Sequence, residues 1–253
     1  MSIYIEIIAL IIIGFIAGVI NTISGGGSAL TLPALILLGL PPSVANGTNR
    51  IGILVQSVTA AAGFRSKKVS ITPFDTFGNV GIGIAVLTGA IVGAVIAIDI
   101  NEEIFNKILA VVMLVVILGV IFKPKMTTKG QERLTGKHLW TSIIVFFCIG
   151  IYAGFIQAGT GILILLVFSA INHLTLVASN AAKTGIVFII TFGALLIFAY
   201  NNQINYGYGL ILALGNAVGG WVASRWSVKK GNGLVKGFML VTVIIMAIKL
   251  WMD

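Results

Sequence analysis

The stretch that decides the fold is residues 14–28, GFIAGVINTISGGGS. It lies inside a long apolar run, Ile3 to Leu40, which the residues from Ser24 to Ser28 interrupt with three glycines. The piece after the interruption has only about a dozen residues, so as a helix it covers about 18 Å and cannot cross a bilayer alone. The sequence therefore predicts a broken or re-entrant helix. A membrane tolerates one only where protein or a water-filled cavity shields the free backbone.

The composition around this stretch indicates an all-α polytopic membrane protein. Of 253 residues, 58% are hydrophobic and 9% are charged, with a mean hydropathy of +1.10. A soluble domain carries about 25% charged residues. Apolar runs near the length of about 20 residues that a spanning helix needs predict six full spans. These are Ser43 to Phe64, Thr72 to Ile98, Ile104 to Phe122, Leu174 to Tyr200, Tyr206 to Trp226 and Gly233 to Met252.

The broken helix occurs a second time, in the run Leu139 to Ile171, where residues 157–161 read QAGTG. Other motifs repeat in the same order, which indicates an internal duplication. We predict two four-element repeats, residues 1–122 and 138–253, each a glycine-broken helix followed by three transmembrane helices. A basic cytoplasmic linker, residues 123–137, joins them. The matched motifs are GFIAG from Gly14 with GIYAG from Gly150, VANGTNR from Val44 with VASNAAK from Val177, and Gly89 and Gly93 with Gly215 and Gly219.

Three basic loops predict the orientation. If each broken helix is a hairpin that returns to its own side, all three loops are cytoplasmic, in line with the positive-inside rule, and the halves are inverted. If each broken helix crosses once, the halves are parallel and the last basic loop is external. We favour inverted halves, a recurring plan of secondary transporters, in a multi-pass protein of the plasma (cell) membrane. The loop cations are Arg65, Lys67, Lys68, Lys123, Lys125, Lys129, Arg133, Lys137, Arg225, Lys229 and Lys230.

The two glycine breaks form the predicted ligand site. Free N–H groups at the N-terminus of a half-helix carry partial positive charge and bind anions, and glycine lets a ligand approach the backbone. The competing interpretation is close helix packing through small residues, which is common in membranes. Because the two breaks are at equivalent positions, we favour the ligand site. Its candidate residues are Asn21, Ser24, Gly25, Gly26, Gly27, Ser28, Gln157, Gly159, Thr160 and Gly161.

Two cations, Arg50 and Lys183, occupy equivalent positions in the repeats. An ionisable residue inside a span is a functional-site hypothesis by default, since its insertion costs roughly 2.5–3.5 kcal/mol. Arginine also matches the oxygen geometry of carboxylates and sulfonates. The alternative is that both side chains snorkel to the headgroups from helix ends, and the sequence leaves both open. Polar neighbours expected to line the same cavity are Asn46, Thr48, Asn49, Ser179 and Asn180.

The sequence predicts neither an enzyme nor a cofactor or metal site. The two histidines and one cysteine have no zinc-ligand spacing, and GxxxxGK[ST] and hydrolase motifs are missing. The basic residues lie between apolar runs, so we expect no nucleic-acid partner. Glu6, Asp75 and His173 are the best-placed groups for coupling to a proton, although all three also fit interfacial or loop positions. A proton as coupling ion and a homo-oligomeric assembly are both left open.

The repeated motifs resemble those of the sulfite exporter TauE/SafE family, also called TSUP permeases. GFIAGVINTISGGGS from Gly14 and VANGTNR from Val44 carry the resemblance, and GIYAGFIQAGTG from Gly150 and VASNAAKT from Val177 are looser second copies. In the second copy, Lys183 stands where the first has Arg50. The resemblance implies secondary transport of a small sulfur-containing anion such as sulfite, sulfoacetate or another organosulfonate.

We therefore expect a permease that works by alternating access, with the anion between the two glycine breaks. The alternative is an anion channel, which shares the broken helices but needs no alternating gate. A third hypothesis is an assembly protein of the membrane with no transported ligand.

Overall fold

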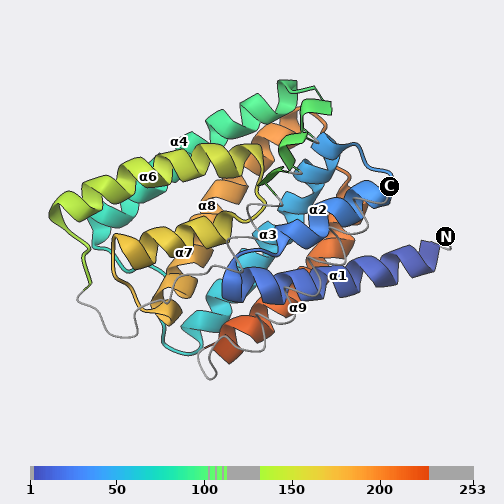
Figure 1. The fold of residues 1–253 in the computed structure, drawn as a ribbon. Coiled ribbons are helices and arrows are strands. Elements are labelled where there is room, and N and C mark those ends of the chain that lie inside the picture. Colours follow the sequence, from blue (N-terminus) through green and yellow to red (C-terminus); the bar gives the residue numbers. More distant parts are fainter. Residues whose placement is uncertain (1–2, 102, 106, 110, 113–131, 228–253) are drawn as a thin grey trace.

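The computed structural model describes residues 3–227 except 102, 106, 110 and 113–131, and this part of the chain is all-α (Figure 1). The prediction of an all-α protein is confirmed for these residues. The helices are α1 (Ile3–Ser24), α2 (Ser28–Leu37), α3 (Pro42–Arg65), α4 (Thr76–Asp99), α6 (Gly136–Phe155), α7 (Thr160–Ala170), α8 (Leu176–Tyr200) and α9 (Tyr206–Ser227).

Four described helices are long and apolar enough to cross a membrane. They are α1, α4, α6 and α8. The predicted spans Ser43 to Phe64 and Tyr206 to Trp226 also form long helices, α3 and α9, but these are less apolar. In α3 the reason is the polar run from Asn46 to Arg50, which is buried against neighbouring helices. The span Gly233 to Met252 and most of Ile104 to Phe122 lie outside the described residues.

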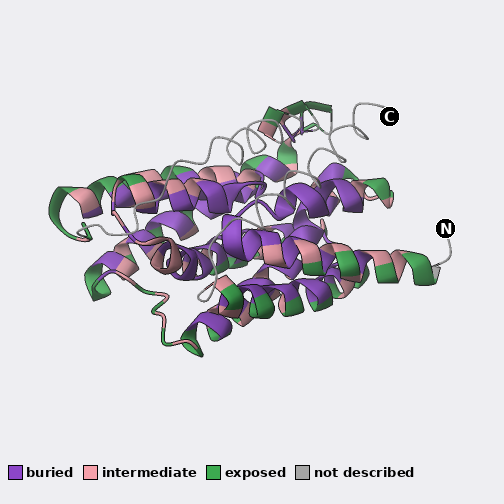
Figure 2. Ribbon diagram, turned by 60° about the horizontal axis from the view of Figure 1, so that its bottom comes forward, coloured by how far each residue is buried: buried purple, intermediate pink, exposed green. Residues whose placement is uncertain are grey.

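Exposed positions lie on the outward sides of the helices and buried positions lie between the helices (Figure 2). Many of the exposed positions hold large apolar residues. Ile8, Ile84 and Leu214 are 58%, 59% and 62% exposed. A soluble monomer rarely exposes broad apolar surface, so these faces suit contact with lipid.

The chain reverses direction at both glycine breaks. Gly25, which has a φ of +83°, separates α1 from α2, and Leu35 of α2 packs in one cluster with Leu10 of α1. Likewise Asn172, just beyond α7, exchanges hydrogen bonds with Ser142 of α6 at 3.0–3.2 Å. Therefore α2 runs back along α1, and α7 runs back along α6.

Glycines bring α1 and α9 into close contact. A Cβ on Gly14 would lie 2.5 Å from Leu212 O, and a Cβ on Gly18 would lie 2.7 Å from Asn216 O. Residue numbers rise together along this contact, so α1 and α9 run in the same direction. Small residues permit this close approach of two helix backbones.

The same kind of contact joins α4 and α6 (Figure 1). A Cβ on Gly89 would lie 3.0 Å from Ile151 N, and a Cβ on Gly93 would lie 2.8 Å from Phe155 N. These helices also run in the same direction. Each pair joins the first helix of one predicted repeat to the last described span of the other.

The remaining contacts assign directions to the other helices. Along α3 and α9 numbers rise together, because Gly52 contacts Leu212 and Gly63 contacts Trp221. By contrast α3 and α8 run in opposite directions, since Gly47 contacts Phe198 while residues 57–66 line a cavity with residues 184–188. Contacts from Gly83 to Ile189 and from Gly193 to Leu87 align α4 with α8. Thus α1, α3 and α9 run one way, and α4, α6 and α8 run the other way.

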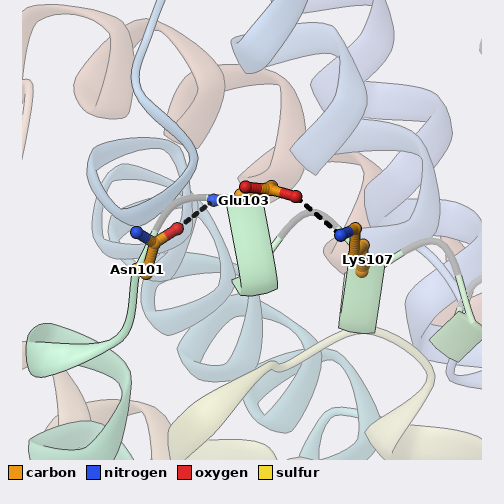
Figure 3. Close-up of polar contacts among 3 residues, drawn as sticks. All are labelled: Asn101, Glu103 and Lys107. Atoms are coloured by element: carbon orange, nitrogen blue, oxygen red, sulfur yellow. Dashed lines mark hydrogen bonds and ion pairs between the residues drawn. The ribbon is translucent and has the colours of Figure 1, made fainter.

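The turn after α4 starts another helical stretch. Asn101 Oδ1 accepts a hydrogen bond from the Glu103 N–H at 2.8 Å, and Lys107 Nζ pairs with Glu103 Oε1 at 2.6 Å (Figure 3). Both side chains of the ion pair are about three-quarters exposed, so it contributes about 0–1 kcal/mol. The pair joins two successive turns of one helix, because the described residues between 103 and 112 are helical.

Candidate functional site

The two glycine breaks touch each other. A Cβ on Gly25 would overlap the backbone of Gly161 and lie 2.6 Å from Ile162 N, and a Cβ on Gly161 would lie 2.9 Å from Gly25 O. The structure thus brings together two segments that the sequence places 136 residues apart. Only glycine fits at either position.

The two short helices start at this contact without side-chain caps. The N-cap residue of α2 is Gly27, and that of α7 is Gly159, with a φ of +70°. Because glycine has no side chain, neither N-terminus receives the usual hydrogen bond from Ser, Thr, Asp or Asn. A helix N-terminus of this kind, with its partial positive charge, is suited to bind an anion.

The predicted site residues are all buried, and those other than glycine are at most 8% exposed. Arg50 is 0% and Lys183 is 2% exposed. Both side chains end in the protein interior, so the snorkelling alternative is wrong.

Arg50, on α3, binds the end of α6. Its Nη2 donates to Gly154 O at 2.6 Å and to Asn46 Oδ1 at 3.5 Å, and its Nη1 donates to Ala153 O at 3.2 Å and to Gln157 Oε1 at 3.4 Å. The guanidinium also lies 4.7 Å from the centre of a phenylalanine ring, that of Phe198, as a cation–π contact. Four of its five N–H groups therefore have acceptors within the protein.

Lys183, on α8, binds the end of α1. Its Nζ donates to Asn21 O, Thr22 O and Asn180 Oδ1, each at 2.9 Å. The arrangement mirrors that of Arg50, because each cation reaches the last turn of the broken helix in the other predicted repeat. The sequence pairs the two cations but does not predict these partners.

Side-chain amides reinforce both breaks. Asn21 Nδ2 donates to Gln56 Oε1 at 2.9 Å, and Gln56 Nε2 donates to Thr22 Oγ1 at 3.0 Å. In the second predicted repeat, Gln157 Nε2 donates to Thr191 Oγ1. Gln56, Thr22 and Thr191 are not among the residues predicted for the site. The sequence does mark them, because they are polar residues inside apolar spans, and such residues commonly form hydrogen bonds between helices.

Several hydroxyl groups of the predicted site already bond within the protein. Ser24 Oγ donates to Ile20 O at 2.8 Å, and Thr160 Oγ1 donates to Gln157 O at 3.0 Å. Thr48 Oγ1 accepts from the Asn205 N–H at 2.8 Å and so anchors the turn before α9. These three hydrogen bonds hold the site together within the protein.

Three buried donors near the cations have no hydrogen-bond partner within the described part of the chain. They are Asn49 Nδ2, Arg50 Nε and Ser179 Oγ. Asn49 is held in place by its other end, where Oδ1 accepts from Thr31 Oγ1 at 2.6 Å. Leaving a buried donor without a partner is costly, and a bound ligand or water would remove that cost.

The candidate proton-coupling groups lie outside the site. Glu6 accepts a hydrogen bond from the Tyr208 hydroxyl at 3.2 Å, and Asp75 caps α4 by accepting from Gly78 N at 2.7 Å. His173 follows α7 in a turn with a φ of +54°.

Known proteins resemble this chain over nearly its whole length. The sequence model of a family described as Sulfite exporter TauE/SafE matches residues 10–250. Probable membrane transporter protein ORF9 of Sinorhizobium sp. is 28% identical over 248 residues, covering 96% of this chain and 92% of that protein. A probable membrane transporter protein of Haemophilus influenzae is 26% identical over 254 residues, covering 100% of this chain and 98% of that protein. Probable membrane transporter protein YfcA of Escherichia coli K12 is 26% identical, covering 96% and 89%. No solved structure matches.

Proposed function

The chain belongs to the sulfite exporter TauE/SafE family, and from that premise we propose that it is a secondary transporter for a small sulfur oxyanion or organosulfonate, such as sulfite or sulfoacetate. Its relatives carry the name of probable membrane transporters, which agrees with a transport role and with a non-enzymatic protein.

The observation that carries the proposal is the contact between Gly25 and Gly161. It puts the uncapped N-termini of α2 and α7 next to each other, in a buried region. Spare donors on Asn49, Arg50 and Ser179 lie on the two helices that bind the breaks. Such a collection of N–H and O–H donors suits an oxyanion, whose oxygens accept hydrogen bonds.

The charge of the interior agrees with an anionic ligand. Among the described residues, the buried charged side chains are Arg50 and Lys183, both cationic. The described acidic residues are all at least partly exposed.

The helix directions support inverted halves and alternating access. Equivalent helices of the two repeats, such as α1 and α6 or α3 and α8, run in opposite directions. In a membrane, the reversal at each break would return α2 and α7 to the side from which they came, as re-entrant hairpins. Rocking of one half against the other would then expose the site alternately to the two sides of the plasma membrane.

Transport of labelled anions into proteoliposomes tests the proposal. We expect uptake of sulfite or an organosulfonate that is accelerated by unlabelled anion on the other side, because a carrier shows counterflow and a channel does not. No flux with any sulfur oxyanion or sulfonate refutes the substrate class.

A matched pair of serine variants tests the site. Ser179→Ala removes a donor without a partner, whereas Ser57→Ala removes a buried hydroxyl that already donates to Ile53 O at 2.8 Å. We expect the KM for the anion to rise about tenfold to a hundredfold in Ser179→Ala, the effect of one lost hydrogen bond to a charged ligand, and to stay unchanged in Ser57→Ala. Equal KM values in the two variants would place the ligand elsewhere.

A further inference from the structure

The ends of α1 and α6 carry free backbone carbonyls that lie in the protein interior. The last four carbonyls of an α-helix have no partner in the helix itself. α1 ends at Ser24 and α6 ends at Phe155, both close to the buried glycine breaks. Water does not reach such carbonyls inside a bilayer, so protein donors have to satisfy them.

At the end of α6 every terminal carbonyl has a hydrogen-bond donor. Ala153 O and Gly154 O accept from Arg50. Phe155 O accepts from Asn46 Nδ2 at 2.7 Å, and Tyr152 O accepts from a backbone N–H at 2.8 Å. All four terminal carbonyls therefore have donors, and three of those four come from the side chains of α3.

At the end of α1 the corresponding donor is Lys183. It covers Asn21 O and Thr22 O, while the Gly25 N–H also donates to Asn21 O at 3.0 Å. A positive charge at a helix C-terminus also compensates the negative end of the helix dipole. Arg50 and Lys183 thus perform the same task for two different helices.

The N–H groups of both cations are almost all used for capping, which leaves few of them to bind an anion. An ammonium group has three protons, and Lys183 directs bonds to three acceptors in the protein. Arg50 retains only Nε, because its other four N–H groups have acceptors. Lys183 therefore has to give up one of its three bonds before it can bind an anion, and Arg50 offers an anion only Nε unless it releases one of its present acceptors.

We propose that Arg50 and Lys183 are positioning residues, a reciprocal pair of caps through which each repeat holds the broken helix of the other repeat at the anion site. α3 of the first repeat caps α6 of the second, and α8 of the second caps α1 of the first. This inference rests on the proposed function for its setting. It makes the two cations supports of the site, with only the Nε of Arg50 left for the anion.

The proposal predicts a specific pattern in transport kinetics. Lys183→Gln removes the ammonium donor, so the end of α1 loosens and the conformational cycle is impaired. We expect a fall in maximal rate of about tenfold or more with a KM within about threefold of wild type. Lys183→Arg retains donors for both carbonyls and should recover at least part of the rate. Lys107→Gln, an exposed cation in the pair with Glu103, is the control and should match wild type.

A direct ligand would give a different result. In that case Lys183→Gln would raise the KM about tenfold or more, and the arginine variant would not restore the rate. That pattern overturns the proposal for Lys183. Arg50 keeps a spare Nε beside the site, so its capping role is tested by hydrogen exchange instead.

Hydrogen exchange tests the caps even if no transported anion is found. We expect Lys183→Gln to speed amide exchange in residues 20–28 of the first repeat, and Arg50→Gln to speed it in residues 152–161 of the second. The effect therefore crosses from the mutated repeat to the other one. Exchange that increases only around the mutated residue, or not at all, overturns the proposal. If the glutamine variants do not fold, the same measurement on Lys183→Arg and Arg50→Lys serves, with smaller increases expected in the same segments.

Discussion

Replacing Gly25 by alanine should lower the free energy of unfolding far more than the same change at Gly39, because Gly25 lies where the two glycine breaks touch. Both glycines have a left-handed backbone, with φ of +83° and +88°. They differ in their surroundings, because a Cβ on Gly39 meets nothing within 4 Å, whereas one on Gly25 overlaps the backbone of Gly161. The pair therefore separates the conformational effect from the effect of the contact.

The structure allows each contribution to be sized. Holding alanine in the left-handed region costs roughly 1–2 kcal/mol, and this is the whole expected effect of Gly39→Ala. Forcing a methyl group into a packed backbone contact costs typically about 1–3 kcal/mol, and more where the neighbour is backbone that cannot move aside. Gly161→Ala carries this second cost alone, and Gly25→Ala carries both, for a total of about 2–5 kcal/mol.

The assay is reversible unfolding of the purified protein in mixed micelles, followed by its near-ultraviolet signal. Transport by the variants that remain folded is measured in proteoliposomes. We expect the order of stability to be Gly39→Ala, then Gly161→Ala, then Gly25→Ala as the least stable, with transport lost in the last two. Equal stability of Gly25→Ala and Gly39→Ala within about 0.5 kcal/mol, the usual range of a neutral surface change, would refute the contact.

Three further predictions concern the packing of the helices. Gly93→Ala should destabilise the protein by about 1–3 kcal/mol because the methyl group meets the α6 backbone, whereas Gly83→Ala on the same helix has ordinary contact and should be neutral or stabilising, as the two unfolding curves would show. A membrane-impermeant maleimide should fail to label Cys148, an exposed thiol on the span α6, in sealed vesicles and should label it after solubilisation in detergent; efficient labelling in the vesicles would contradict the placement of α6 in lipid. Asn172→Ala should cost about 1–3 kcal/mol, measured by unfolding, because it leaves the buried Ser142 hydroxyl and a loop carbonyl without their amide partner; a loss below about 0.5 kcal/mol would argue against that network.

The elements that the sequence predicts well are those that depend on local pattern. The predicted span Ser43 to Phe64 is the helix Pro42–Arg65, because a long apolar run bounded by proline and basic residues has clear ends. The two glycine breaks are also where the sequence puts them, since three consecutive glycines, or a glycine with a positive φ, end a helix whatever its neighbours are.

The partners of the cations could not be predicted in the same way. Repeat alignment pairs Arg50 with Lys183, but Arg50 lies 104 residues from Gly154 and Lys183 lies 162 residues from Asn21. A periodic pattern identifies the face of a helix and not the element that covers it. Snorkelling near a helix end and bonding to a distant helix end require the same residue in the same sequence position, so only the three-dimensional arrangement distinguishes them.

The glycine contact between α1 and α9 has a consequence for the synthesis of the chain. Gly14 and Gly215 are separated by about 200 residues, which a ribosome adds in roughly 10–40 s. During that interval the glycine face of α1 has no permanent neighbour, although the helix has already left the ribosome. A chain truncated before α9 would leave this face open to other membrane helices and to quality-control proteases. Completion of the last part of the chain therefore decides whether the first part is retained.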